Sequence, residues 1–188
     1  MTSSTSSPIA PADSPATASA STHRIPTIVH PADGQSVRSF GNEILFKLTA
    51  EETAGSFTLG LASVPAGGGP PAHVHDAEDE LFLILEGQYR VYVDGEWTDV
   101  GPGSAVYLPR GREHTFQVIG ATPGRHWVLT TPSGFERYYS RVASLFAAPG
   151  APDGAQLAAI NAEHRVRFAR VAGAAPVASE PFNGTHME

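Results

Sequence analysis

The chain has 188 residues, 41% of them hydrophobic, and a formal net charge of −7, so it can bury one good core but not two large domains. Its 12 cationic residues are scattered and its pI is near 5.6, which argues against nucleic acid or a membrane surface as partner and favours a small molecule. The absence of cysteine excludes disulfides and thiolate metal sites, so imidazole and carboxylate are the remaining metal-binding groups.

The N-terminal segment 1–36 is rich in Ser, Thr, Ala and Pro, and we predict that it is mostly disordered. It cannot bury enough apolar surface to offset the entropy lost on ordering. A plastid-type transit peptide over residues 1–22 is the weaker alternative, because no arginine precedes Arg24. Neither a bilayer-spanning apolar run nor a signal-peptide pattern is present, so a cytoplasmic protein is the expectation.

Residues 37–132 have the pattern of an all-β domain. About nine short strands are separated by Gly and Pro corners, and Asp94-Gly95 is the preferred pair for a tight hairpin turn. This pattern predicts an antiparallel sandwich or small barrel. In the strand predicted over 43–50 the apolar residues do not alternate cleanly, and residues 80–86 are almost continuously apolar. The first of these patterns suits a strand that is covered on both faces.

Residues 133–171 predict a helical extension. The hydrophobic period lengthens to nearly four at Phe135, Tyr139, Val142 and Phe146, which indicates a helix packed on the outside of the barrel. Asp153, followed three residues later by Gln156, predicts the start of a second helix. Residues 172–188 are expected to form a flexible tail.

Candidate metal ligands gather in the stretch 67–87. His73 and His75 project side by side if this part is extended, and Glu80 lies on one face of the next strand. His114 follows a later Gly/Pro turn. Three imidazoles and one carboxylate would bind one divalent transition metal ion, which could be Fe, Mn, Ni, Co, Cu or Zn, and would leave coordination positions open.

Several alternatives remain at this level. A histidine pair on a strand can also be hydrogen-bonded without metal, and Glu78 competes with Glu80 as the carboxylate ligand. His126 either lines the cavity or faces solvent, because Trp127 beside it claims one of the two faces. Strand phase predicts an apolar pocket wall above the metal, although ordinary core packing would require the same residues: Phe82, Ile84, Phe116 and Val118.

Two spacings in the sequence resemble the motifs of the cupin superfamily. The first is Gly67, five residues, His73-Val74-His75, four residues, Glu80, six residues and Gly87. The second is Gly103, five residues, Pro109-Arg110-Gly111, two residues and His114. Val118 stands where the family often has Asn, which is not one of its metal ligands. The resemblance implies a small jelly-roll (cupin) barrel with these residues inside.

The segment 132–139, PSGFERYY, is also similar to the one that follows the last strand in bacterial quercetinase-like cupins. This likeness implies a metal-dependent dioxygenase that uses O2 on a flavonol or other enolisable aromatic. His73, His75 and His114 would hold the metal, and Glu80 would ligate it or remove the substrate's hydroxyl proton. Alternatives are redox-neutral isomerisation or decarboxylation of a small hydroxy or keto acid, and non-catalytic ligand binding. Many cupins are dimeric, so a homodimer is also implied, with strands before Gly55 pairing across the two-fold axis.

Overall fold

The computed structural model describes residues 26–147 and 152–169. The disorder predicted for residues 1–25 and the flexible tail predicted for residues 172–188 lie outside the described residues. The first strand begins at Gln35, slightly before the point where the apolar pattern starts. Within the described ranges, no helix combines the length and the apolar character needed to cross a membrane.

Eleven strands and three helices are present in the described residues. In chain order they are β1 (Gln35–Ser39), β2 (Asn42–Leu48), α1 (Ala50–Thr53), β3 (Thr58–Val64), β4 (His73–His75), β5 (Asp79–Glu86), β6 (Gln88–Val93), β7 (Glu96–Val100), β8 (Ala105–Leu108), β9 (His114–Ile119), β10 (Gly124–Thr131), α2 (Phe135–Ala147), α3 (Gly154–Glu163) and β11 (Val166–Phe168).

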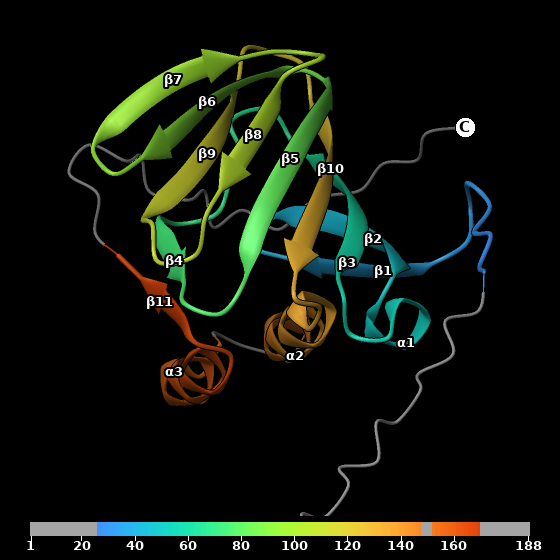
Figure 1. The fold of residues 1–188 in the computed structure, drawn as a ribbon. Coiled ribbons are helices and arrows are strands. Elements are labelled where there is room, and N and C mark those ends of the chain that lie inside the picture. The colour runs from blue at the N-terminus through green and yellow to red at the C-terminus, as the bar shows by residue number, and fades with distance from the viewer. Residues whose placement is uncertain (1–25, 148–151, 170–188) are drawn as a thin grey trace, which may run out of the picture.

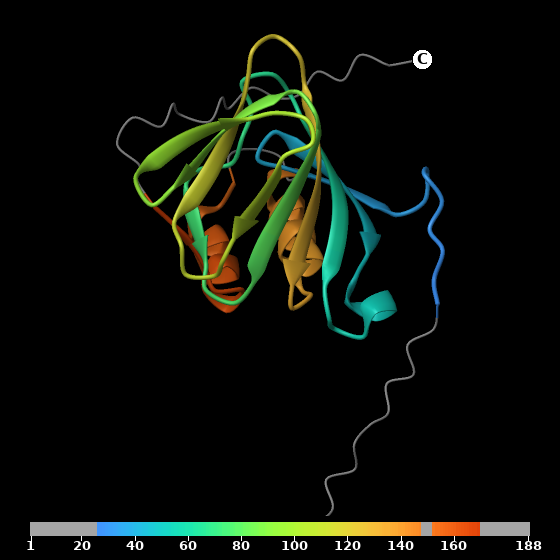
Figure 2. The same cartoon turned by 45° about the horizontal axis from the view of Figure 1, so that its top comes forward.

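The strands form two antiparallel sheets that face one another (Figures 1 and 2). The six-stranded sheet has the order β1-β2-β3-β10-β5-β8, and the five-stranded sheet has the order β11-β4-β9-β6-β7. The predicted all-β jelly-roll class is confirmed. Two elements were not predicted: the short helix α1, which begins at Ala50, the last residue of the strand expected over 43–50, and β11, which returns from the helical extension to pair with β4.

Turns and close approaches set the register of the sheets. Val93 pairs with Glu96 across the Asp94-Gly95 turn, as the dipeptide predicts. Gly87, which separates β5 from β6, has a φ of 84°, and a Cβ there would lie 2.7 Å from the Cα of Gly124. Only glycine fits this backbone position without rearrangement.

Alternation along the strands places one face of each sheet inside the molecule. In β5 the inward residues are Glu80, Phe82 and Ile84, which share a face as predicted. In β9 they are His114, Phe116 and Val118. The core therefore fills the space between the sheets, and polar residues with metal-binding chemistry enter it at one end of these strands.

The helices lie outside the sheets. In the view of Figure 1, α2 lies below the end of β10, which it follows in the chain, and its buried face includes Phe135, Tyr138, Tyr139 and Val142. The helix predicted after Asp153 is α3, and the Asp153 carboxylate caps it by accepting from the backbone N–H of Ala155 at 2.8 Å.

Candidate metal centre

Three strands bring the four predicted ligands together. His73 and His75 come from β4, Glu80 from β5 and His114 from β9. The register pairs His73 with His114, and the ligand atoms of all four residues lie within 4.8 Å of one another. We call these four residues the ligand cluster. Since the ring centroids of His73 and His114 are 4.4 Å apart, residues far apart in sequence share one small site.

Backbone carbonyls orient two of the imidazoles. The Nδ1 of His73 lies 2.8 Å from the Pro71 carbonyl oxygen, and the Nδ1 of His114 lies 3.0 Å from that of Arg112. A carbonyl can only accept, so in the neutral form of each ring Nδ1 carries the hydrogen and Nε2 keeps its lone pair. This is the arrangement in which metal-binding histidines are usually held by the protein groups behind them.

The inner atoms of the ligand cluster have few partners within the described residues. His75, Glu80 and His114 are almost completely buried, yet neither ring nitrogen of His75 has a hydrogen bond, and the Nε2 of His114 and the Oε2 of Glu80 face each other at 3.2 Å. Burying such atoms without a partner is costly. A metal ion coordinated by them would remove that cost, so the residues fit the metal that the motif predicts.

Electrostatics keeps the carboxylate charged. Burial by itself raises the pKa of Glu80, but contact with His114 and the charges of the neighbouring imidazoles lower it below its usual value. Burial by itself lowers the pKa of His114, but Glu80, whose Oε2 lies 3.2 Å from Nε2, raises it. For His73, burial and the other two imidazoles hold the pKa well below its usual value. Without metal, the contact therefore favours the charged forms of both Glu80 and His114, and a metal ion would compete with a proton for His114.

Glu78, the competing carboxylate, lies beside the ligand cluster but is not a member of it. Its Oε2 is 3.7 Å from the Nδ1 of His75, too far for a hydrogen bond. Glu80 instead lies in phase with the inward residues of β5 and lines the cavity.

Three members of the ligand cluster, His73, His75 and Glu80, line a cavity with a mainly apolar wall. Phe82 and Phe116 also line it, whereas Ile84 and Val118 are buried in the core and are not lining residues. The reason is depth, because each second residue along a strand lies about 7 Å further from the cluster. The complete lining is Phe40, Asn42, Ile44, Ala62, Val64, Pro70, His73, His75, Glu80, Phe82, Phe116, His126, Val128, Phe135, Tyr138, Tyr139 and Phe168.

His126 faces the cavity, which decides the alternative left open by the sequence, while Trp127 takes the outer face of β10. The Nδ1 of His126 lies 2.9 Å from the Tyr89 hydroxyl, and its ring packs against Phe82 with centroids 4.8 Å apart. Burial lowers the pKa of His126 to about 4, although the charge of Glu80 opposes this. The imidazole is therefore neutral at neutral pH.

Sequence reasoning missed the contribution of the C-terminal extension to the cavity. Phe135, Tyr138 and Tyr139 of α2 line it, and so does Phe168 of β11. The apolar stripe of α2 was the available signal, but it indicated only that this face is buried and not against what. Asn42 was also missed; it is buried in the lining, and its Oδ1 has no hydrogen-bond partner among the described residues.

Comparison with known proteins bears on the same strands. Residues 60–129, which include β4 to β9 and most of β3 and β10, match the model of the cupin domain. The chain contains a cupin domain. Solved structures agree on this fold: a predicted oxalate decarboxylase from Thermotoga maritima superposes with a TM-score of 0.53 at 18% identity, over 56% of this chain and 99% of that one.

Relatives of this chain differ in what their names state. An uncharacterized protein of Methanocaldococcus jannaschii is 33% identical over 35% of this chain and 53% of its own length. Quercetin 2,3-dioxygenase of Bacillus subtilis is 25% identical over 50% of this chain but only 28% of its own length. The polyketide cyclase RemF of Streptomyces resistomycificus superposes with a TM-score of 0.51 at 28% identity, over 58% of this chain and 81% of that one. The chain thus spans about half, or less, of the length of these two curated relatives.

Proposed function

We propose that this cupin is a metal-dependent dioxygenase acting on a flavonol or another enolisable aromatic. The observation that carries the proposal is the buried ligand cluster at the wall of a cavity lined mainly by aromatic and aliphatic side chains. The likeness of half the chain to quercetin 2,3-dioxygenase supports the substrate class. The cavity would receive a flat apolar ring system and place its hydroxyl and keto oxygens at the ligand cluster.

The four residues of the ligand cluster would hold a divalent ion. When bound, the ion supplies Lewis-acid polarisation of a substrate oxygen and the redox chemistry that O2 requires. With three neutral imidazoles and one carboxylate around it, the site has a net charge of about +1, which favours an anionic ligand such as an enolate. These residues do not identify the metal, because imidazole and carboxylate ligands bind several first-row ions.

Glu80 is the proposed general base in the alternative in which its carboxylate stays off the ion. The carboxylate is ionised, and its Oε2 lies 3.2 Å from the Nε2 of His114. It could take the proton of a substrate hydroxyl bound next to the ligand cluster and so produce the enolate. Phe82, Phe116 and Phe135 would exclude water from that exchange, and His126, neutral at this depth, would face the substrate without adding charge.

A second candidate is redox-neutral chemistry in the same cavity, namely cyclisation, isomerisation or decarboxylation. The likeness to a polyketide cyclase favours it, because a polyketide is rich in enolisable carbonyl groups and its cyclisation consumes no O2. Glu80 would again move the proton, and no oxidant would be required. Dependence on O2 therefore separates the two candidates.

The decisive experiment is turnover of a flavonol panel by protein loaded with each first-row divalent metal, with and without O2. The proposal expects oxygen uptake and ring-opened product with at least one metal. Product formed without O2 would support the redox-neutral candidate. Tight flavonol binding without turnover under every condition would contradict the dioxygenase proposal and indicate a ligand-binding cupin.

Alanine variants of the ligand cluster test the metal site independently of activity. We predict that His73→Ala, His75→Ala and His114→Ala each lower the bound metal measured by elemental analysis, because each removes one ligand. His164→Ala is the matched control, since His164 lies outside the cluster. Unchanged metal content in all three cluster variants would contradict the site.

The role of Glu80 as base is tested by Glu80→Gln. We predict that this variant reduces turnover by about 100-fold or more, because an amide cannot take up the substrate's proton. Steady-state kinetics measures the loss, with each rate divided by the metal content of the same sample. Turnover per bound metal that matches the unmodified protein would remove Glu80 from the proton transfer.

A further inference from the structure

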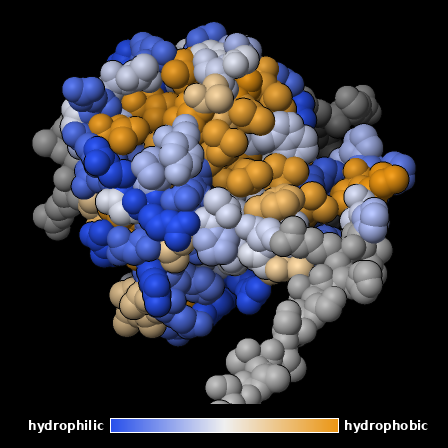
Figure 3. Space-filling view, in the orientation of Figure 1, coloured by the Kyte–Doolittle hydropathy of each residue, from blue (hydrophilic) through white to orange (hydrophobic). Residues whose placement is uncertain are grey.

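Phe40 and Asn42, at the turn from β1 into β2, both line the cavity. Apolar residues also gather on the outer face of the same sheet, where β5, β8 and β10 face the viewer (Figure 3). A polar side chain buried on the inner face of such a sheet needs a hydrogen-bond partner. Among the described lining residues outside the ligand cluster, only Asn42 has a buried polar atom without one.

The amide group of Asn42 is only half satisfied. Asn42 is 5% exposed, and its Oδ1 has no hydrogen-bond partner among the described residues. Burial raises the pKa of Tyr139, and a hydrogen bond with the Asn42 side chain opposes this. A hydrogen bond that lowers the pKa of a phenol is donated to its oxygen, so the amide NH2 faces the Tyr139 hydroxyl. The Oδ1 is left as an available acceptor in the cavity wall.

Ser39 lies directly opposite Asn42 in the register of β1 and β2. It is 4% exposed, and its Oγ likewise has no hydrogen-bond partner within the described ranges. Residues opposite each other in an antiparallel pair point to the same face, so two unpartnered oxygens lie side by side at the turn. Because each such buried atom is costly, the pair indicates that this part of the wall receives a polar group.

The turn itself departs from the residues that its backbone favours. Phe40 and Gly41 have φ values of 51° and 73°, the left-handed pair of a two-residue hairpin turn, in which Asn, Asp or Gly is preferred at the first position. A phenylalanine strains this backbone. Its ring, however, lines the cavity and packs against Phe168 with centroids 5.7 Å apart. The sequence of the turn therefore serves the cavity rather than the hairpin.

Asn42 and the ligand cluster belong to different parts of the cavity wall. In the six-stranded sheet, β10 and β3 separate the strand of Asn42, β2, from β5, which carries Glu80. The wall between them is aromatic, because the ring centroid of Phe135 lies 5.1 Å from that of Tyr139 and 5.5 Å from that of His75. Besides burial, the charge of Glu80 raises the pKa of Tyr139, so the carboxylate and the hydroxyl beside Asn42 act on the same space. A planar ligand held at the cluster could therefore extend to Asn42.

We infer that Asn42 is a specificity-determining residue whose Oδ1 accepts a hydrogen bond from a hydroxyl group of the ligand. The inference rests on the proposed function for the ligand class. It narrows that class to aromatics with a further hydroxyl, remote from the hydroxyl and keto oxygens placed at the ligand cluster. An acceptor buried in an apolar wall discriminates by penalty, because a ligand without the hydroxyl leaves Oδ1 unpaired. A methyl ether at the same position cannot donate either.

Calorimetric titration of the zinc-loaded protein without O2 tests the inference by affinity. Zn²⁺ has no redox chemistry, so the measurement requires no oxidative turnover. The probes are unsubstituted flavonol and flavonols with one added hydroxyl on the pendant or the fused ring. We expect at least one hydroxylated flavonol to bind about tenfold more tightly than flavonol, the size of one buried hydrogen bond. The methyl ether of that hydroxyl should lose this gain.

Asn42→Leu should abolish the preference, because an apolar side chain of similar size leaves no acceptor to satisfy. The two flavonols should then bind within about twofold of each other. Asn161→Leu is the matched control. The Oδ1 of Asn161 accepts from the hydroxyl of Tyr138, the neighbouring tyrosine of α2, at 3.1 Å, but Asn161 is not among the residues that line the cavity. Its variant should keep the preference.

The probe comparison within the unmodified protein remains informative if Asn42→Leu fails to fold. No gain from any added hydroxyl, a gain that methylation leaves intact, or a preference retained by Asn42→Leu would overturn the inference. In each of these cases flavonol still binds, so the proposed function stands. Failure of every flavonol to bind would instead contradict the proposed function and, with it, the inference.

Discussion

His126 and Tyr89 form a buried polar pair that the metal motif does not include. The two side chains are nearly inaccessible, and their contact joins β10 of one sheet to β6 of the other. The pair also packs against Phe116, whose ring centroid lies 5.3 Å from that of His126. A hydrogen bond between the sheets at this depth fixes the orientation of the imidazole inside the cavity.

We predict that His126 makes the protein less stable in acid. Its pKa is about 4 in the folded protein and about 6.5 when unperturbed, so only the unfolded chain takes up the proton between these values. This contribution to the free energy of unfolding is complete above about pH 6.5 and is lost as the pH falls toward 4. Urea denaturation should show that, between about pH 7 and about pH 4.5, the free energy of unfolding falls by about 2 kcal/mol more for the unmodified protein than for His126→Leu. Equal losses would contradict the assignment.

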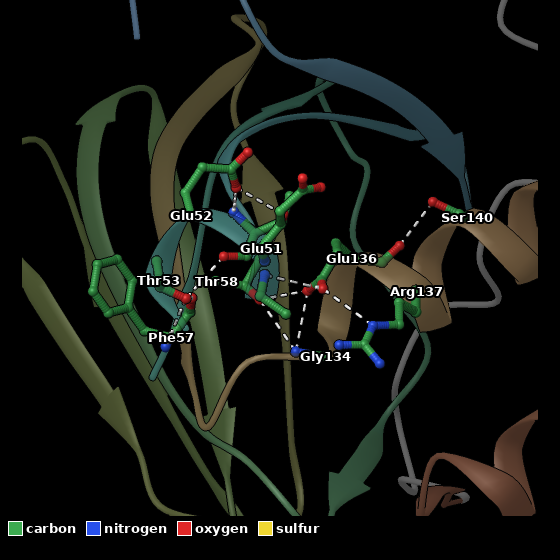
Figure 4. A network of polar contacts seen from close by, with 11 residues as sticks. Glu51, Glu52, Thr53, Phe57, Thr58, Gly134, Glu136, Arg137 and Ser140 are labelled. Atoms are coloured by element: carbon green, nitrogen blue, oxygen red, sulfur yellow. Dashed lines mark hydrogen bonds and ion pairs between the residues drawn. The ribbon is translucent and has the colours of Figure 1, made fainter. Parts of the chain in front are cut away.

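At the scale of elements, a single carboxylate joins α2 to the rest of the molecule. Glu136 in the first turn of α2 accepts hydrogen bonds from the Thr58 hydroxyl at 2.5 Å, the Gly134 N–H at 3.1 Å and the Ala50 N–H at 3.3 Å (Figure 4). These donors belong to β3, to the turn before α2 and to the first residue of α1. The network therefore positions the helix that carries Tyr139 into the cavity lining.

We predict that Glu136→Gln lowers the free energy of unfolding by about 2 kcal/mol at neutral pH, since hydrogen bonds to a charged group are lost. Burial by itself raises the pKa of Glu136, but the hydrogen bond from Thr58 and those from the backbone lower it. A lowered folded pKa means that this stabilisation is present above the usual pKa of a glutamate and disappears as the pH falls through the folded value. Denaturant titration at neutral and acidic pH measures both effects, and Glu51→Gln, an exposed change in α1, is the control. A cost no larger than that of the control would show that the network is dispensable.

The other element that closes the site is β11. It pairs Phe168 with His73, and the Phe168 ring contacts the rings of both His73 and Phe40. Arg167 holds the strand further through an ion pair with Asp76 at 2.6 Å. A three-residue strand from the C-terminal extension thus covers the outermost histidine of the ligand cluster.

We predict that Phe168→Ala releases bound metal to a chelator severalfold faster, because the ring that covers His73 is removed while all four ligands remain. Equilibrium metal content should stay unchanged. Phe146→Ala is the matched control, since the Phe146 ring packs on the same Phe40 ring, with centroids 5.3 Å apart, whereas the contact with His73 belongs to Phe168. Stopped-flow chelation measures the rates. Equal rates for the two variants would mean that β11 does not limit access to the site.

At the scale of the whole molecule, the two sheets enclose one inner space and present two outer faces. Each strand of the six-stranded sheet contributes side chains both to the inner space and to an outer face. In β5 the inward series carries Glu80 and Phe82, and the outward series carries Leu81 and Leu83. The residues of the candidate site and those of the apolar outer face therefore alternate along the same strand. This is why the strand has a nearly continuous apolar sequence although one of its faces is open to solvent.

The sequence by itself determined what depends on local spacing. Strand alternation, the Asp94-Gly95 turn, the His-x-His pair and the interval to Glu80 follow from the two-residue period of a strand and from turn chemistry, so the all-β class and the four members of the ligand cluster could be predicted. The start of α3 at Asp153 could be predicted because a capping side chain is likewise a local signal.

Only the tertiary structure decided which side chains far apart in the sequence come into contact. Periodicity shows that one face of α2 is buried, but the register of the sheets and the anchoring of Glu136 place Tyr139 at the cavity. Periodicity leaves open whether His126 faces the cavity or solvent. The structure places it inward, in contact with Tyr89. Periodicity also places Ile84 and Phe82 on the same face of β5. Their different depths along the strand put Phe82 in the cavity wall and Ile84 in the core. Such outcomes depend on pairing between distant strands, which no local pattern encodes.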